Sequence, residues 1–122
     1  MVKIIENTLV IRVEGRNINM IAGGLPTSGS RGCDTCMFLF EGDDWDGLEK
    51  SVVFWQEKDK RYEKPMGPAD TCAVPYEALE LDGFLFLGLI GRSGEVIQNS
   101  KVLLVPLCDG TRAGNVTEIH CG

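Results

Sequence analysis

The sequence predicts one all-β domain over residues 1–122, an antiparallel β-sandwich of the immunoglobulin-like or jelly-roll-like kind with one short helical turn. Apolar residues recur with the period of strands, and turn-forming residues interrupt them about every 8 to 12 positions. No segment offers the amphipathic helix of ten or more residues that parallel strands need for their crossovers. With 43% apolar and 25% charged residues, the chain has the composition of an ordinary globular domain.

The N-terminal third predicts short strands and one long loop. Residues 4–5 and 9–13 are typical of two short strands, and residues 18–21 of a third. Residues 22–35 contain four glycines and a proline, too many breakers for regular structure. We therefore expect a flexible loop at 22–35, followed by a strand at 37–40.

An acidic bend follows in the segment EGDDWDGLEK, before a strand at 52–55. Trp45 and Leu48 are expected to fold this bend back onto the core, with Asp46 and Gly47 forming its turn. The carboxylates do not have the spacing of an EF-hand calcium loop, since Leu48 would occupy a ligand position. The sequence therefore predicts a solvated acidic turn.

The C-terminal half predicts one helical turn between strands. Pro75 suits the first position of a helix, so PYEALE, which contains Leu79, is expected to be helical as far as the turn at Gly83. Apolar runs at 84–90 and 102–105, separated by a hairpin tip at 91–94, predict two fully buried strands. The polar segment 108–122 is expected to be an edge strand or an extended tail.

Catalytic motifs are missing from the sequence. The single histidine, His120, is third from the C-terminal end, a poor position for a catalytic base. Neither a phosphate-binding glycine loop nor a zinc-protease motif is present. The sequence therefore predicts a non-enzymatic protein without a cofactor.

Five cysteines, an odd number with no preceding signal peptide, predict reduced thiols made in a cytoplasm, with Cys72 and Cys108 as small core residues. Cys33 and Cys36 form a CxxC pair. A zinc site needs a second pair of ligands, and a redox pair needs a helix N-terminus, which the following strand does not provide. A metal-binding or redox protein using Cys33 and Cys36 stays open as an alternative.

Charge and hydropathy exclude two classes of partner. The net charge of −6 repels phosphate backbones, so nucleic acid is not an expected partner. No apolar run approaches the roughly 20 residues of a membrane-spanning helix.

Residues 37–105 resemble virion structural modules of phages that infect Gram-positive bacteria, especially the N-terminal domains of baseplate upper proteins and related tail or head fibre proteins. The resemblance rests on the strings FLFEGDDWDGLEKSVVFW and TCAVPYEALELDGFLFLGLIG. The residues that carry the motif are Trp45, Asp46, Gly47, Leu48, Pro75, Leu79, Gly83 and Gly91. In these motifs Trp45 and Leu48 pin the bend, and Gly83 and Gly91 make tight turns.

The resemblance implies a structural protein of the virion, made in the host cytoplasm: a capsid decoration, a head-fibre base or a small baseplate component. Its expected partners are other virion proteins and further copies of itself, a trimer being favoured. Leu25, Pro26 and Arg31 in the long loop are candidate contact residues. A carbohydrate-binding module is a further alternative, with Trp45, Trp55, Tyr62 and Tyr76 as possible stacking residues.

Overall fold

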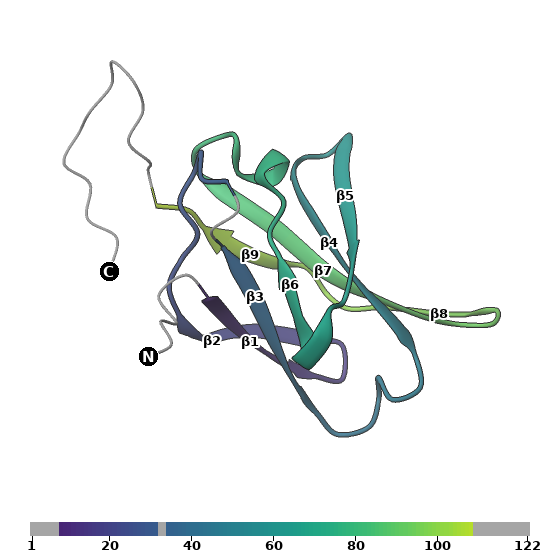
Figure 1. Ribbon diagram of the computed structural model, residues 1–122. Coiled ribbons are helices and arrows are strands. Elements are labelled where there is room, and N and C mark those ends of the chain that lie inside the picture. The colour runs from purple at the N-terminus through teal and green to yellow at the C-terminus, as the bar shows by residue number, and fades with distance from the viewer. Residues whose placement is uncertain (1–7, 32–33, 109–122) are drawn as a thin grey trace, which may run out of the picture.

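The computed structural model describes residues 8–31 and 34–108, and it places them in two packed β-sheets (Figure 1). The expectations for a strand at 4–5, for Cys33 and for the tail beyond Cys108 fall outside these residues. The all-β sandwich-like fold predicted from the sequence is confirmed. No helix within 8–31 and 34–108 has the length and apolar character needed to cross a membrane.

The first sheet has four strands in the order β2-β1-β3-β6. The second has the order β5-β4-β7-β8, and β9 also pairs with β7. β9 pairs with the first half of β7 and β8 with its second half, so both lie along the same edge of β7. The strands are β1 Thr8–Glu14, β2 Asn17–Gly23, β3 Thr35–Glu41, β4 Glu49–Glu57, β5 Lys60–Pro65, β6 Thr71–Ala73, β7 Phe84–Ser93, β8 Val96–Asn99 and β9 Leu103–Pro106.

The core lies between the sheets, because every strand that crosses it alternates buried with more exposed residues. Phe38 of β3 and Phe54 of β4 are the largest fully buried side chains. They pack with a cluster of aliphatic residues from both sheets. The described core is apolar except for Ser28 and Asp34.

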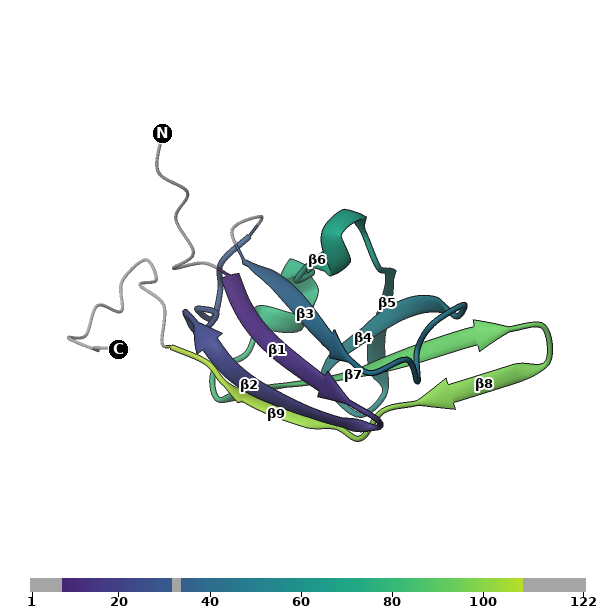
Figure 2. The ribbon, with the colours of Figure 1, turned by 90° about the horizontal axis from the view of Figure 1, so that it is seen from below.

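One strand pair departs from the expected antiparallel arrangement. β1 and β3 are parallel, so the chain must cross from β2, on one side of β1, to β3 on the other (Figure 2). Parallel neighbours require a long crossover connection, because a tight turn cannot join them. The glycine-rich segment between β2 and β3 provides that crossover.

The described part of this crossover, 24–31 and 34, is tied to the rest of the fold by backbone hydrogen bonds, and the expected flexibility of the loop at 22–35 stays a prediction. Ser28 N–H donates to the Cys108 carbonyl at 2.8 Å, and Cys108 N–H donates to the Pro26 carbonyl at 2.9 Å. Gly29 N–H donates to the Leu79 carbonyl at 2.6 Å. Glycines and serines here supply backbone groups for these bonds, so their breaker character does not imply mobility.

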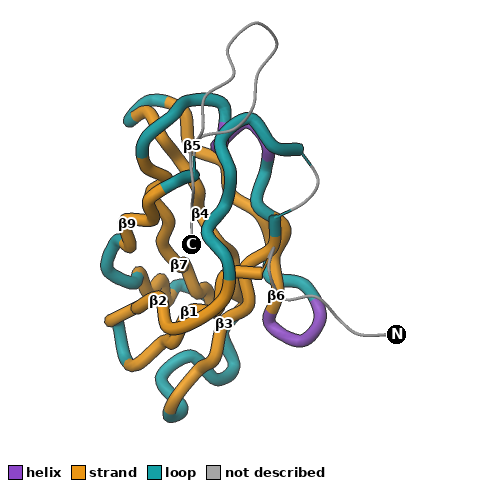
Figure 3. The backbone as a smooth tube through the Cα atoms, turned by 90° about the vertical axis from the view of Figure 1, so that its left-hand side faces the viewer, coloured by secondary structure: helices purple, strands orange, loops and turns teal. Residues whose placement is uncertain are grey.

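The helical segments also differ from the expected single helix. Two short 3-10 turns, η1 Pro68–Asp70 and η2 Tyr76–Leu79, lie at opposite ends of β6 (Figure 3). Pro75 is the residue before η2, with an extended backbone, and is not its first helical residue. The turn at Gly83 is as expected, since its φ of 110° favours glycine.

Candidate binding surface

The two apolar strands expected to be fully buried, β7 and β9, are buried on one side only. Phe84 of β7 is 50% exposed and Leu104 of β9 is 47% exposed. A continuous apolar run usually indicates a strand covered on both sides. Here one side faces the core, and the other forms the outer face of the five-stranded sheet. We use that name for the outward residues Val53, Trp55, Arg61, Glu63, Phe84, Phe86, Gly88, Ile90, Arg92, Ile97, Asn99 and Leu104.

A row of four side chains crosses the outer face from β5 to β9. Strand register places Arg61 opposite Trp55, Trp55 opposite Phe86 and Phe86 opposite Leu104. The Trp55 and Phe86 rings stack, with centroids 5.7 Å apart and planes 14° apart. The Arg61 guanidinium lies 4.3 Å from the Trp55 ring centroid. These contacts form a rigid aromatic ridge on an exposed sheet.

A hollow with a volume of about 480 Å³ opens beside this ridge. Gly88 forms part of its floor, and Val53, Ile90, Asn99 and Val102 are among the residues around it. A Cβ atom added at Gly88 would meet the Ser100 Oγ at 3.5 Å, an ordinary contact. The glycine is therefore not required by the fold, and its effect is to leave the hollow open.

Charges on the outer face are balanced, although the whole chain is acidic. Arg92 Nη1 and Nη2 donate to the two carboxylate oxygens of Glu63 at 2.6 and 3.2 Å, joining β7 to β5 across β4. The Arg92 hydrogen bonds hold the pKa of Glu63 below its ordinary value. Arg61 and Glu49 are a further cation and anion on these strands. The face therefore presents apolar surface without a large net charge.

Trp55 is poorly arranged for stacking on a sugar. Arg61 and Phe86 come from strands on opposite sides of β4, so they occupy the two faces of the indole. A sugar ring needs one free aromatic face. The arrangement favours contact with a protein surface over carbohydrate stacking.

The residues of the bend motif form a structural unit. Trp45 is 2% exposed, and the acidic side chains around it, Asp43, Asp44 and Asp46, are exposed as expected. Gly47 has a φ of 78°, which fits its place in the turn. Gly91, expected in a hairpin tip, instead lies inside β7.

Gly91 is needed for packing. A Cβ atom there would lie 2.8 Å from the Leu48 Cδ1 and 3.0 Å from the Trp45 ring. The tip of this hairpin lies farther along, at Gly94, where φ is 59°.

Cys72 is a buried, free core thiol as expected, whereas Cys36 and Cys108 differ from expectation. Cys36 is buried in β3, opposite the buried Cys72 of β6, and both thiols are free. Cys108 is disulfide-bonded, so the prediction of a reduced Cys108 is wrong. Within 8–31 and 34–108 no group of three or more histidine, cysteine or acidic residues could hold a metal ion.

The three candidate contact residues of the long loop do not form one exposed site. Pro26 is fully buried, and Leu25 packs against the core cluster. Arg31 is exposed, and its guanidinium lies 3.9 Å from the centroid of the Tyr76 ring. Pro26 therefore cannot contact a partner in this conformation.

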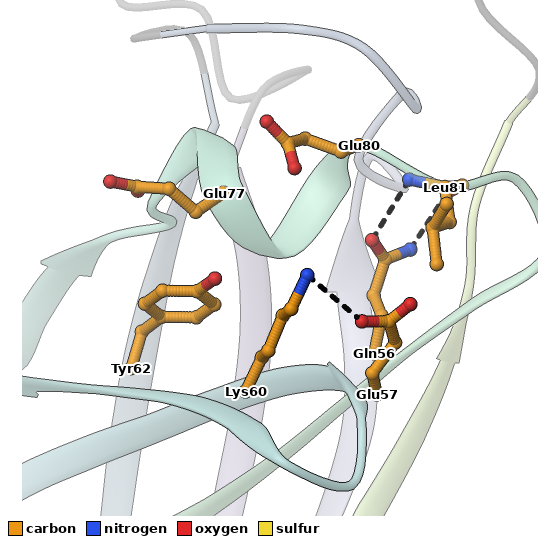
Figure 4. Close-up of a pocket in the computed structure, with 7 residues that line it drawn as sticks. All are labelled: Gln56, Glu57, Lys60, Tyr62, Glu77, Glu80 and Leu81. Carbon is orange, nitrogen blue, oxygen red and sulfur yellow. Dashed lines mark hydrogen bonds and ion pairs between the residues drawn. The ribbon is translucent and has the colours of Figure 1, made fainter.

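A smaller hollow of about 100 Å³ lies between the β4–β5 hairpin and η2 (Figure 4). The Gln56 amide donates to the Leu81 carbonyl at 2.7 Å and accepts from the Leu81 N–H at 3.0 Å. Lys60 Nζ lies 3.4 Å from Glu57 Oε1. These contacts tie the hairpin to the chain after η2, so we interpret this hollow as a structural junction.

No protein-family model, curated protein or solved structure matches this chain.

The outer face was not predicted from the sequence, because runs such as FLFLGLI do not show which alternate residues face solvent. The sequence feature that indicates the outer face is Gly88 within this run, together with Arg92 on the same side of β7 and Asn99 on the same side of β8. Polar and small residues on one side of an apolar strand indicate that this side is not core.

Proposed function

We propose that the protein is a non-enzymatic structural protein of a phage virion that binds neighbouring subunits through the outer face of its five-stranded sheet. The observation that carries the proposal is the aromatic ridge and hollow on an exposed apolar sheet. Contiguous apolar surface on a folded domain marks interaction sites. Aromatic and arginine anchors such as Trp55 and Arg61 are the residues that contribute most to interfaces.

The virion assignment is supported by the resemblance of residues 37–105 to tail and head fibre modules. A capsid decoration, a head-fibre base and a small baseplate component all require a compact domain that attaches to repeated surfaces. The neutral outer face suits contact between identical acidic copies, because like charges do not oppose each other there. We expect a homo-oligomer, with three copies favoured by analogy with fibre proteins.

Two matched variants test this proposal. Leu104→Lys places a charge on the outer face, and Leu39→Lys places one on the outside of the four-stranded sheet at a similar exposure, 43% against 47%. We expect Leu104→Lys to weaken self-association by at least about tenfold, since burying an unpaired charge costs more than about 1.4 kcal/mol. Leu39→Lys should associate like the unmodified protein.

Light scattering after size exclusion measures the association, and co-sedimentation with virions measures attachment to the particle. A monomeric wild-type protein that ignores particles would contradict the proposal. Equal behaviour of the two variants would place the interface elsewhere. Glycan binding that Trp55→Ala abolishes would instead support the carbohydrate-binding alternative.

A further inference from the structure

β6 brings Cys72 directly opposite Cys36 of β3. The two residues are register partners in an antiparallel pair, and both side chains are buried on the core side. Cα atoms of such partners lie about 4.5 to 5.5 Å apart, inside the range of about 4.4 to 6.8 Å that disulfides adopt. Both thiols are free. The backbone therefore already holds the two sulfurs in positions from which they can be joined.

Cys72 is the more accessible partner. It lies at the edge of an open hollow of about 520 Å³, whose lining includes Arg31, Lys64 and Tyr76. The two cations outnumber the single anion of the lining, Glu77, which favours an anionic molecule in this hollow. Cys36, its register partner on β3, is fully buried and does not line the hollow.

The same asymmetry distinguishes the two thiols chemically. Burial raises the pKa of both, and for Cys36 the nearby Cys72 and Asp34 raise it further. For Cys72 the charge of Lys64 acts in the opposite direction and lowers the pKa. Since the thiolate is the nucleophile, Cys72 is the thiol that attacks first.

Access to Cys72 is eased by the position of β6. This strand has three residues and stands at the end of its sheet, paired with β3. Local opening of a short edge strand costs far less than global unfolding. The thiol can therefore meet a small reactant without loss of the sandwich.

We propose that Cys72 and Cys36 are a cross-strand dithiol that is oxidised to a disulfide by a low-molecular-weight disulfide, such as glutathione disulfide, entering this hollow. The Cys72 thiolate attacks one sulfur of the reagent, whose S–S bond breaks and releases one thiolate. The Cys36 thiolate then attacks the Cys72 sulfur and releases the second. Two protein thiols are oxidised, one reagent disulfide is reduced, and the two protons end on the released thiols.

Closure of this disulfide would fix the edge strand β6 to β3 and close the loop between residues 36 and 72. A cross-link of this length restricts the unfolded chain and raises stability. The result is a reversible covalent staple at the free edge of the four-stranded sheet. This inference does not depend on the proposed virion function.

The test uses the full chain with glutathione disulfide at neutral pH, followed by peptide mapping and mass spectrometry. We expect a Cys36–Cys72 linked peptide with the loss of two hydrogen atoms, and a higher thermal midpoint than before oxidation. Mapping separates this bond from those of the other three cysteines.

Single variants test the order of the two steps. Cys36→Ala should accumulate one glutathione on Cys72, because the Cys36 thiol that would displace this glutathione is gone. In the Cys72→Ala variant, glutathione disulfide should modify Cys36 at least tenfold more slowly than it modifies Cys72 in the Cys36→Ala variant. Absence of the linked peptide in the wild-type protein would overturn the dithiol, and equal modification rates in the two variants would overturn the assigned roles.

Discussion

Trp45 connects parts of the chain that are far apart in sequence. Its indole N–H donates to the Gly15 carbonyl in the turn between β1 and β2, at 2.7 Å. Its ring packs against Phe40 of β3, with centroids 6.1 Å apart, and against Gly91 of β7. One side chain in the acidic bend thus joins both sheets.

Trp45→Ala should lower the free energy of unfolding by about 3 to 5 kcal/mol, the cost of deleting a large buried aromatic side chain. Gly91→Ala should also destabilise, by about 1 to 3 kcal/mol, because the added methyl group overpacks the same contact. Denaturant unfolding measures both, with Gly88→Ala as the glycine control that its surroundings tolerate. An unchanged unfolding midpoint for Trp45→Ala would show that the ring is not an anchor.

Asp34 is a buried carboxyl group with an incomplete set of partners. The Thr27 N–H donates to it, but Oδ2 has no hydrogen-bond partner among the described residues. Burial raises the pKa of Asp34 above its ordinary value of 3.8. The folded state therefore binds this proton more tightly than the unfolded state, and stability falls as pH rises through the interval between the two pKa values.

Asp34→Asn should consequently stabilise the protein at neutral pH relative to wild type, and the difference should shrink below about pH 4. Thermal unfolding of both proteins between pH 3 and pH 7 measures it, with the exposed Asp43→Asn as the control. A destabilisation that is the same at every pH would mean that the carboxylate forms an essential contact.

At the scale of elements, strand existence was predictable and strand environment was not. Continuous apolar runs bounded by turn residues located β3, β4, β7 and β9, because these run lengths and turn signals are local properties of the sequence. The parallel pairing of β1 with β3 and the exposure of one side of β7 depend on contacts far along the chain. The candidate binding surface depends on those long-range contacts, which a local sequence pattern does not show. The contact residues predicted from the sequence were therefore Leu25, Pro26 and Arg31 of the long loop, and not residues of the outer face.

The crossover between β2 and β3 behaves as a packed element. Ser28 is 2% exposed, and its Oγ lies 2.7 Å from Asp82 Oδ1. Ser28→Ala should lower the free energy of unfolding by about 1 kcal/mol, the usual net value of a buried hydrogen bond. Ser30→Ala, two residues on and less buried, should change it little. Equal stability of both variants would support the expectation of a flexible loop.

At the scale of the whole molecule, a net negative charge is combined with exposed apolar surface. The chain carries a net charge of −6, yet on the outer face Arg92 pairs with Glu63 and Arg61 adds a second positive charge. The β7–β8 hairpin extends beyond the rest of the sheet and carries the exposed Val96 and Ile97 (Figures 1 and 2). Apolar contact therefore drives association in the proposed assembly, and long-range charge opposes it.

The balance between apolar attraction and charge repulsion determines whether salt strengthens or weakens self-association. Raising the salt concentration from about 50 to 500 mM shortens the screening length well below 10 Å, which weakens repulsion between acidic copies. Apolar contacts are not screened, so self-association should be unchanged or stronger at high salt. Sedimentation velocity over a concentration series measures the dissociation constant, and Leu104→Lys is the control for contact through the outer face. A tenfold weakening at high salt would mean that ion pairs, and not the aromatic ridge, hold the copies together.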